Sequence, residues 1–207
     1  MNNSLKQVLL VCVCLFALNG QVIADSLSDA NRAFDAGDYA KSAKLFRPLA
    51  QRGDAEAQIN LGMMYYRGEG VSQDYKEAVK WYRLAAKQGN AYAQLNLGMM
   101  YDNGQGVPQD YKEVVKWWRL AAEQGNATAQ YSLGGMYEHG NGVPQDYVLA
   151  YMWANIAAVI AMEWLYASEF QKIVNYRDSI AKKMTAQQIV KAQQLARKCT
   201  GKKFKGC

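Results

Sequence analysis

The sequence predicts an all-α fold, an α-solenoid (superhelix) of stacked antiparallel helix pairs with a 36-residue repeat and C-terminal capping helices. Two observations predict it. A Leu-Gly pair, a tyrosine, an Asp-Tyr pair and a tryptophan each recur every 36 residues, the tryptophans being Trp81, Trp117 and Trp153. Residues 55–90 and 91–126 are identical at 27 of 36 positions. One helix pair cannot bury its apolar face alone, so successive copies are expected to stack.

The first 24 residues are typical of a signal peptide. Lys6 supplies the positive charge, and the apolar run over 8–18 is only 11 residues long, shorter than the roughly 20 needed to cross a bilayer. Small or branched residues before Asp25 favour cleavage after Ala24. We therefore expect an exported protein, periplasmic or secreted, that is a monomer without a transmembrane span once processed. An uncleaved membrane anchor is the alternative.

The remaining chain divides by the repeat. It predicts a divergent leading helix pair (25–54), repeat 1 (55–90), repeat 2 (91–126), repeat 3 with a degenerate second half (127–162), and capping helices with a basic tail (163–207). In the last segment, Thr185 followed by Gln188 predicts a capping box. Ile189, Ala192, Leu195 and Ala196 would then cover the last open face.

Each copy predicts two helices. The first should begin after an Asp or Asn N-cap that follows a glycine: Asp54, Asn90 and Asn126. The second should begin after Asp74 or Asp110, with Glu77 or Glu113 completing a capping box. The Gly-x-Gly segments between them lack the third glycine and the preceding strand of a dinucleotide site, so they indicate helix-helix turns.

The recurring tryptophans are expected to pack in the core. Their neighbours Tyr82 and Trp118 point about 100° away on an α-helix, which predicts that these two aromatics are exposed.

The repeated unit, AxAQxxLGxMYxxGxGVxQDYxxAxxWxxxAAxxGN, resembles the Sel-one-like repeat, a relative of the tetratricopeptide repeat. The resemblance is close from residue 55 to about 158 and weaker over 26–54. It implies a scaffold or adaptor that holds partner proteins, and many bacterial members are exported. Some cysteine-rich relatives are described as binding β-lactams, but they resemble a version with a disulfide in each hairpin. No repeat here contains a cysteine, so a hydrolase of the β-lactamase type is only a remote alternative.

The resemblance also implies where a partner would bind, because the first helices of tetratricopeptide-like solenoids line the concave face. Positions there that differ between copies form one stripe in each copy and are the candidate contacts for a protein or peptide. They are Glu56, Asn60, Met63 and Arg67, then Tyr92, Asn96, Met99 and Asn103, then Thr128, Ser132, Gly135 and His139. Their mixed polar and methionine character suits peptide recognition. A merely solvated helix face is the alternative for each residue.

Enzymatic chemistry finds no support in the sequence. His139 is the single histidine, and no serine or cysteine beside it forms a nucleophile signature. We therefore predict no catalytic, cofactor-binding or metal-binding residues. Without the leader, two cysteines remain, Cys199 and Cys207, and an exported tail favours a disulfide between them.

The charge is concentrated at one end of the chain. Residues 171–207 carry a net charge of +9 with Asp178 as their only acid, whereas residues 25–170 carry −4. Such a tail could attach the protein to an anionic surface, lipid or envelope polymer. Export argues against nucleic acid, and a solvated capping helix is the alternative.

Overall fold

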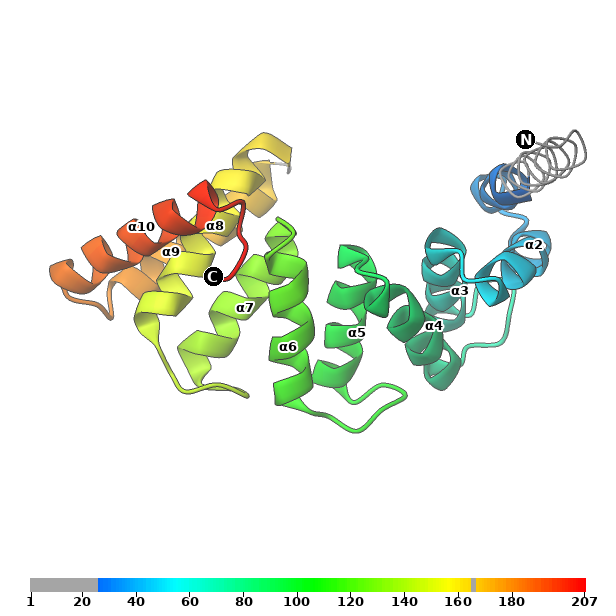
Figure 1. Cartoon of the computed structure of the whole chain (residues 1–207), viewed down its shortest axis with the longest axis horizontal. Coiled ribbons are helices and arrows are strands. Elements are labelled where there is room, and N and C mark those ends of the chain that lie inside the picture. The colour runs from blue at the N-terminus through cyan, green and yellow to red at the C-terminus, as the bar shows by residue number, and fades with distance from the viewer. Residues whose placement is uncertain (1–25, 165–166) are drawn as a thin grey trace, which may run out of the picture. The chain divides into compact units, whose positions relative to one another are not determined.

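The computed structural model describes residues 26–164 and 167–207 (Figure 1). Within them the secondary structure consists of helices and turns without a strand, which confirms the predicted all-α repeat fold. The predicted signal peptide lies outside the described residues, so its presence stays a prediction. The chain forms two compact units, of which the first ends at Leu84 and the second begins at Ala85.

The first unit is built from short helices with a continuous apolar core. The chain is helical over 26–35 and continues into α2 (Tyr39–Gln51), α3 (Ala55–Arg67) and the part of α4 (Tyr75–Lys87) that precedes residue 85. Helices α2 and α3 pack against each other. Phe46, Leu61 and Met64 are fully buried at their centre, and Trp81 joins the same cluster as predicted.

The second unit holds the remaining helices, and α8 lies at its centre. The elements are α5 (Ala91–Asn103), α6 (Tyr111–Ala122), α7 (Ala127–His139), α8 (Tyr147–Trp164), α9 (Ala167–Ala181) and α10 (Ala186–Gly201). Helix α8 packs against α7, α9 and α10 (Figure 1). Trp153 and Ile156 of α8 are buried with Ala192 and Ala196 of α10, so α10 closes the core as predicted. No helix among the described residues is long and apolar enough to cross a membrane.

The first helix of every copy begins and ends as the sequence predicts. The side chains of Asp54, Asn90 and Asn126 accept hydrogen bonds from the backbone N–H three residues later, at 2.8, 3.0 and 2.9 Å. The glycines that follow α3, α5 and α7 have φ between 66° and 74°, a left-handed conformation that costs glycine little.

The loops after α3 and α7 need their second glycine for space as well as for conformation. A Cβ atom on Gly70 would lie 2.2 Å from the carbonyl oxygen of Tyr39, and one on Gly142 would lie 2.3 Å from that of Tyr111. Each loop therefore packs directly on the backbone at the start of an earlier helix. This confirms that the Gly-x-Gly segments are helix-helix turns.

The capping boxes predicted for the second helices are wrong. Asp74 and Asp110 do accept backbone hydrogen bonds from the first turn. The carboxylate of Glu77, however, accepts from the indole Nε1 of Trp81 at 3.1 Å, and Glu113 accepts from Trp117 at 2.8 Å. A buried indole N–H needs an acceptor, and the glutamate four residues earlier lies on the same helix face. The capping box predicted at Thr185 and Gln188 does form.

The prediction that Tyr82 and Trp118 are exposed is also wrong, because their side chains are 3% and 6% exposed. Each ring packs against a glycine of the preceding first helix. A Cβ added to Gly62 would lie 2.9 Å from the ring of Tyr82, and one added to Gly98 would lie 2.4 Å from that of Trp118. The missing side chain at each glycine makes room for a second buried aromatic next to the recurring tryptophan.

A buried glutamine ties each first helix to the helix before it. Gln58, Gln94 and Gln130 are at most 3% exposed. Their Nε2 atoms donate to the carbonyl oxygens of Ala50, Ala86 and Ala122 at 3.0 to 3.1 Å. Sequence reasoning missed this role, although the glutamine recurs in all three copies at the 36-residue spacing.

Candidate partner-binding surface

In the first unit, the candidate contacts lie on the side of α3 away from its buried residues. Glu56 and Arg67 are exposed, whereas Asn60 and Met63 are half-buried. The core-facing residues of the same helix, Ala57, Leu61 and Met64, have no exposed area. The α3 residues therefore offer two charged side chains at the ends of the helix and an amide and a thioether between them.

The leading helix adds a residue to this surface that sequence reasoning missed. Asn31 donates from Nδ2 to Glu56 Oε1 at 2.9 Å, and its Oδ1 accepts from Asn60 Nδ2 at 3.4 Å. Asn31 lies four residues before the end of the leading helix at residue 35, as Met63 does before the end of α3. The 36-residue spacing does not point to it, because the loop after the leading helix is shorter than the loop after α3. These contacts show that the leading helix adjoins the candidate stripe of α3 in this unit.

In the second unit, the candidate contacts lie on α5 and α7. Tyr92 is exposed at 67%, and Met99 is exposed at 37%. Asn103, Thr128 and His139 are also exposed, whereas Asn96, Ser132 and Gly135 are half-buried. The α5 stripe therefore combines an aromatic ring and a thioether with two amides.

His139 is held against its own helix. Its Nδ1 lies 2.9 Å from the carbonyl oxygen of Gly135, one turn earlier. That contact fixes the orientation of the ring at the end of α7. Among the described residues, no group of three or more His, Cys, Asp or Glu side chains could hold a metal ion.

Helix α9 supplies an aromatic side chain to the α7 stripe that the sequence did not point to. The ring of Tyr176 packs edge-on against Tyr131 with centroids 4.8 Å apart. It lies over Gly135, where the other copies carry Met63 and Met99, and its hydroxyl would be 3.8 Å from a Cβ at that position. The third copy thus exchanges a methionine for a tyrosine from another helix. Nothing in the repeat predicts this, because Tyr176 lies outside it.

An ion pair between a buried carboxylate and an exposed lysine lies next to Tyr176. Glu138 is 6% exposed, and its Oε1 lies 2.9 Å from the ammonium of Lys183. Burial acts to raise the pKa of the Glu138 carboxyl, but the hydrogen bond and the charge of Lys183 outweigh burial and lower it. Burial and the neighbouring carboxylate raise the pKa of Tyr176. The ion pair of Glu138 and Lys183 links the turn between α9 and α10 to α7.

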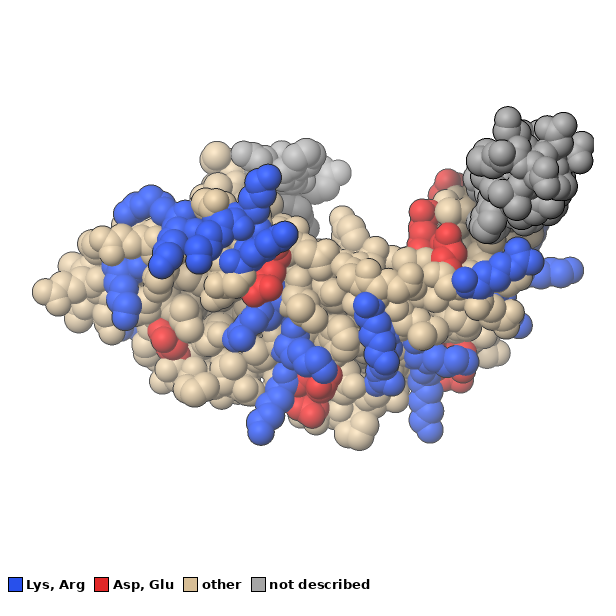
Figure 2. Space-filling model, in the orientation of Figure 1, with Lys and Arg blue, Asp and Glu red and all other residues tan. Residues whose placement is uncertain are grey.

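The basic tail contains a disulfide, and few of its Lys and Arg side chains are paired with an acid. Cys199 and Cys207 are bonded with their sulfur atoms 2.09 Å apart. Among the described residues from 171 onward, ion pairs involve Arg177 with Asp178 and Lys183 with Glu138. Lys and Arg side chains gather over the region of α10 (Figure 2).

Comparison with known proteins agrees with this arrangement. The family model of the Sel1 repeat matches residues 55–90, 91–126 and 127–158. A solved structure of a protective antigen from uropathogenic Escherichia coli, which displays an SLR fold, is 30% identical with a TM-score of 0.56. The match covers 76% of this chain and 40% of that one. A Sel1 repeat protein from Oxalobacter formigenes is 28% identical with a TM-score of 0.61, over 84% of this chain and 75% of that one.

The chain thus spans 40% of the length of the Escherichia coli antigen. No curated protein matches it significantly. Three matched copies, the 36-residue spacing and two similar solved structures together establish that the chain belongs to the Sel1 repeat family.

Proposed function

We propose that this protein is an exported scaffold or adaptor that captures a partner protein or peptide on the first-helix face, defined as the exposed side of α3, α5 and α7. Sel1 repeats form a fold of the protein-interaction scaffold type, which supports the general role. The binding face, the export and the monomeric state do not follow from the family and are proposed here in addition.

The observation that carries the proposal is the pattern of identity between copies. The buried positions of the first helices hardly change, as Leu61, Leu97 and Leu133 illustrate. The exposed position held by Glu56 becomes Tyr92 and then Thr128. Core packing does not restrict these positions, so their side chains are free to be specific for a ligand. A tyrosine exposed at 67% is a residue type that protein interfaces favour.

The chemistry of the α5 stripe suits an extended peptide. The amides of Asn96 and Asn103 each provide a donor and an acceptor, which match the N–H and C=O of a peptide backbone. Met99 and Tyr92 offer adaptable apolar contact for side chains on either side of it. The small net charge of the face predicts that binding persists at high salt, because only ionic contacts are screened.

Site-specific photo-crosslinking tests the face directly. A photoreactive amino acid replaces Tyr92 in one variant and Leu120 in a matched control, since Leu120 is a large apolar residue 39% exposed on the second helix α6. Both proteins are incubated with periplasm or culture supernatant, and crosslinked products are identified by mass spectrometry. We expect a discrete product from position 92 alone. The same product from position 120, or from neither position, contradicts the proposed face.

The basic tail supports a second candidate function, attachment to an anionic surface. Its observation is the net charge of +9 over 171–207 and the small number of acids paired with it. Exposed charges are screened over about 8 Å at physiological salt. Binding to phosphatidylglycerol vesicles should therefore weaken steeply between 50 and roughly 300 mM salt. Salt-independent binding, or equal binding to phosphatidylcholine vesicles, counts against this function.

A further inference from the structure

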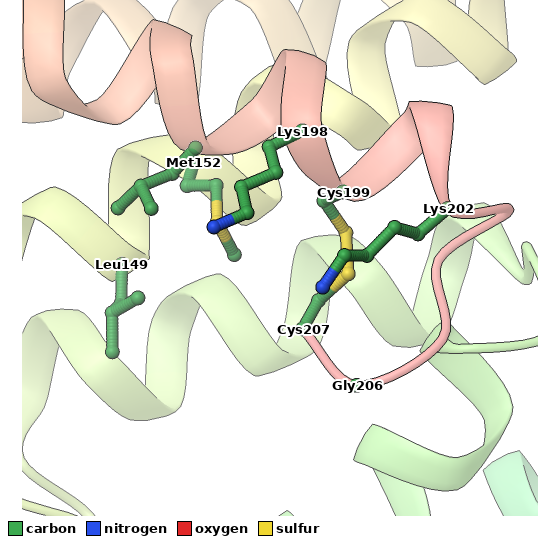
Figure 3. A pocket seen from close by; sticks show the side chains of 8 residues that line it. Leu149, Met152, Lys198, Cys199, Lys202, Gly206 and Cys207 are labelled. Atoms are coloured by element: carbon green, nitrogen blue, oxygen red, sulfur yellow. A yellow bond between two sulfur atoms is a disulfide. The ribbon is translucent and has the colours of Figure 1, made fainter.

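A small pocket lies in the second unit between α8, α10 and the loop that follows α10 (Figure 3). Its volume is about 150 Å³. Leu149 and Met152 of α8 and Leu195 of α10 form its apolar wall, and the disulfide of Cys199 and Cys207 closes one end. Part of the wall is thus made by a loop whose position the disulfide holds.

Two lysines form the rim of the pocket. Lys198 is in the last turn of α10, and Lys202 follows one turn later as its C-cap. Both side chains extend toward the pocket, Lys198 over Met152 and Lys202 over Cys207 (Figure 3). The ion pairs found among the described residues include neither of them. Lysines near a helix C-terminus also interact favourably with the helix dipole, but that role does not require an apolar pocket beside them.

We propose that this pocket binds an amphipathic anion, in which a phosphate or carboxylate lies between Lys198 and Lys202 and an alkyl segment enters the apolar part. A cavity of roughly 150 Å³ accepts benzene in another protein, so this pocket has room for about six carbon atoms. The anion is either a free alkyl phosphate or carboxylate, or the corresponding part of a lipid. The site is independent of the first-helix face, because it is built from α8 and α10.

A chain-length series tests the pocket. Inorganic phosphate, butyl, hexyl and octyl phosphate and the uncharged hexanol are titrated into the protein with its disulfide intact. The methyl NMR signal of Met152 reports on the apolar wall, and calorimetry gives the affinity. Each methylene that enters should tighten binding about fourfold, from roughly 0.8 kcal/mol per buried methylene. We expect this gain to stop near six carbons and hexanol to bind far more weakly than hexyl phosphate.

Two outcomes of that series would overturn the proposal. Affinity that does not depend on chain length means that only the lysine charges act. A gain that continues undiminished to octyl phosphate, without a shift of the Met152 signal, means adsorption to the surface.

A matched pair of variants separates the pocket from general basicity. Lys198→Gln with Lys202→Gln should weaken hexyl phosphate binding at least tenfold. Lys191→Gln with Lys205→Gln removes the same charge from the same tail outside the pocket and should change it less than twofold. Equal weakening in both proteins overturns the assignment to the pocket while leaving the anionic-surface function untouched.

Vesicles of phosphatidylglycerol distinguish the two sources of the anion. If they bind and hexyl phosphate displaces the protein from them, a lipid supplies the anion. If hexyl phosphate binds and the vesicles do not, the ligand is a free molecule. Binding of neither probe overturns the proposal.

Discussion

The first helix has the same length and the same kind of caps in all three copies of the repeat, but the third copy differs in what packs against it. In copies one and two, α4 and α6 are 13 and 12 residues long, and an exposed Glu-Lys pair supports their tryptophans. In the third copy, α8 has 18 residues and is covered by α9 and α10. The regular copies thus show the packing of a helix pair within the repeat, and the longer α8 of the third copy packs on two helices that lie outside it.

The tryptophans should reveal this difference in stability most strongly. Replacement of Trp117 by Ala removes a large buried ring and should destabilise the fold by roughly 3 to 5 kcal/mol. Trp153 is 1% exposed and lies on α8, which packs against α7, α9 and α10, so its replacement should cost an amount at the upper end of that range. Urea denaturation followed by circular dichroism measures both. A cost below about 1 kcal/mol for Trp153→Ala would contradict the central position of α8.

The disulfide is the next largest effect, and it should be confined to the end of the second unit. Its loss in Cys199→Ser with Cys207→Ser should cost about 2 to 3 kcal/mol by the chain-entropy argument. Lys203 and Phe204 have φ of 51° and 67°, a strained conformation for residues other than glycine, so the loop should relax when released. Hydrogen exchange should quicken in the last turn of α10 and not in α3. Mass spectrometry of the non-reduced protein should show two hydrogens fewer than the reduced form.

A pair of glycines tests the packing of first helices against second helices. A Cβ on Gly98 would lie 2.4 Å from the ring of Trp118, so Gly98→Ala should destabilise by about 1 to 3 kcal/mol. Gly135 in the third copy meets only the Tyr176 hydroxyl at 3.8 Å. There, alanine should be neutral or stabilise by up to about 1 kcal/mol through helix propensity. Equal effects in thermal melts would contradict the account of the buried second aromatic.

Asp102 and Glu138 hold the same repeat position, but their carboxyl groups should make the stability of the fold depend on pH in opposite directions. Burial raises the pKa of Asp102, whereas Lys183 holds that of Glu138 below its ordinary value against burial. A carboxyl group whose pKa is raised by folding stabilises the folded state at low pH, where it is protonated. That contribution is lost as the pH rises through the raised pKa. A lowered pKa contributes above the unfolded value and is lost as pH falls. At pH 7, Asp102→Asn should therefore stabilise slightly and Glu138→Gln should destabilise. Both effects should diminish at pH 3, and the same sign for the two variants would refute this comparison.

The sequence predicted the features that depend on neighbours along the chain or on the repeat. N-caps at Asp54 and its equivalents are local, and the core position of Trp81 follows from its spacing. The exposure predicted for Tyr82 is wrong because the periodicity of one helix does not show the space that a glycine leaves on the preceding helix, here Gly62. Glu77 was assigned to a capping box because a local rule ignores the needs of a buried indole.

The candidate surface was predictable in part for the same reason. The α3, α5 and α7 stripes follow from the repeat. Asn31 does not, because the shorter loop after the leading helix moves that helix out of the 36-residue spacing. Tyr176 and the pocket beside Lys198 could not be predicted. They depend on α9 and on a loop closed by a disulfide, neither of which repeats.

The variant with the smallest expected effect on stability tests the central claim, because a loss of binding in it cannot be attributed to a loss of folding. Arg67, Asn103 and His139 are exposed and hold one repeat position in three copies. Their joint replacement by alanine should cost within about 0.5 kcal/mol per site in stability. The measurement is the affinity of this triple variant for the partner identified by crosslinking, beside a thermal melt. The account predicts markedly weaker capture with a nearly unchanged melting temperature. Unchanged capture by the triple variant, together with its loss on removal of residues 199–207, would contradict the first-helix face and assign partner binding to the basic tail.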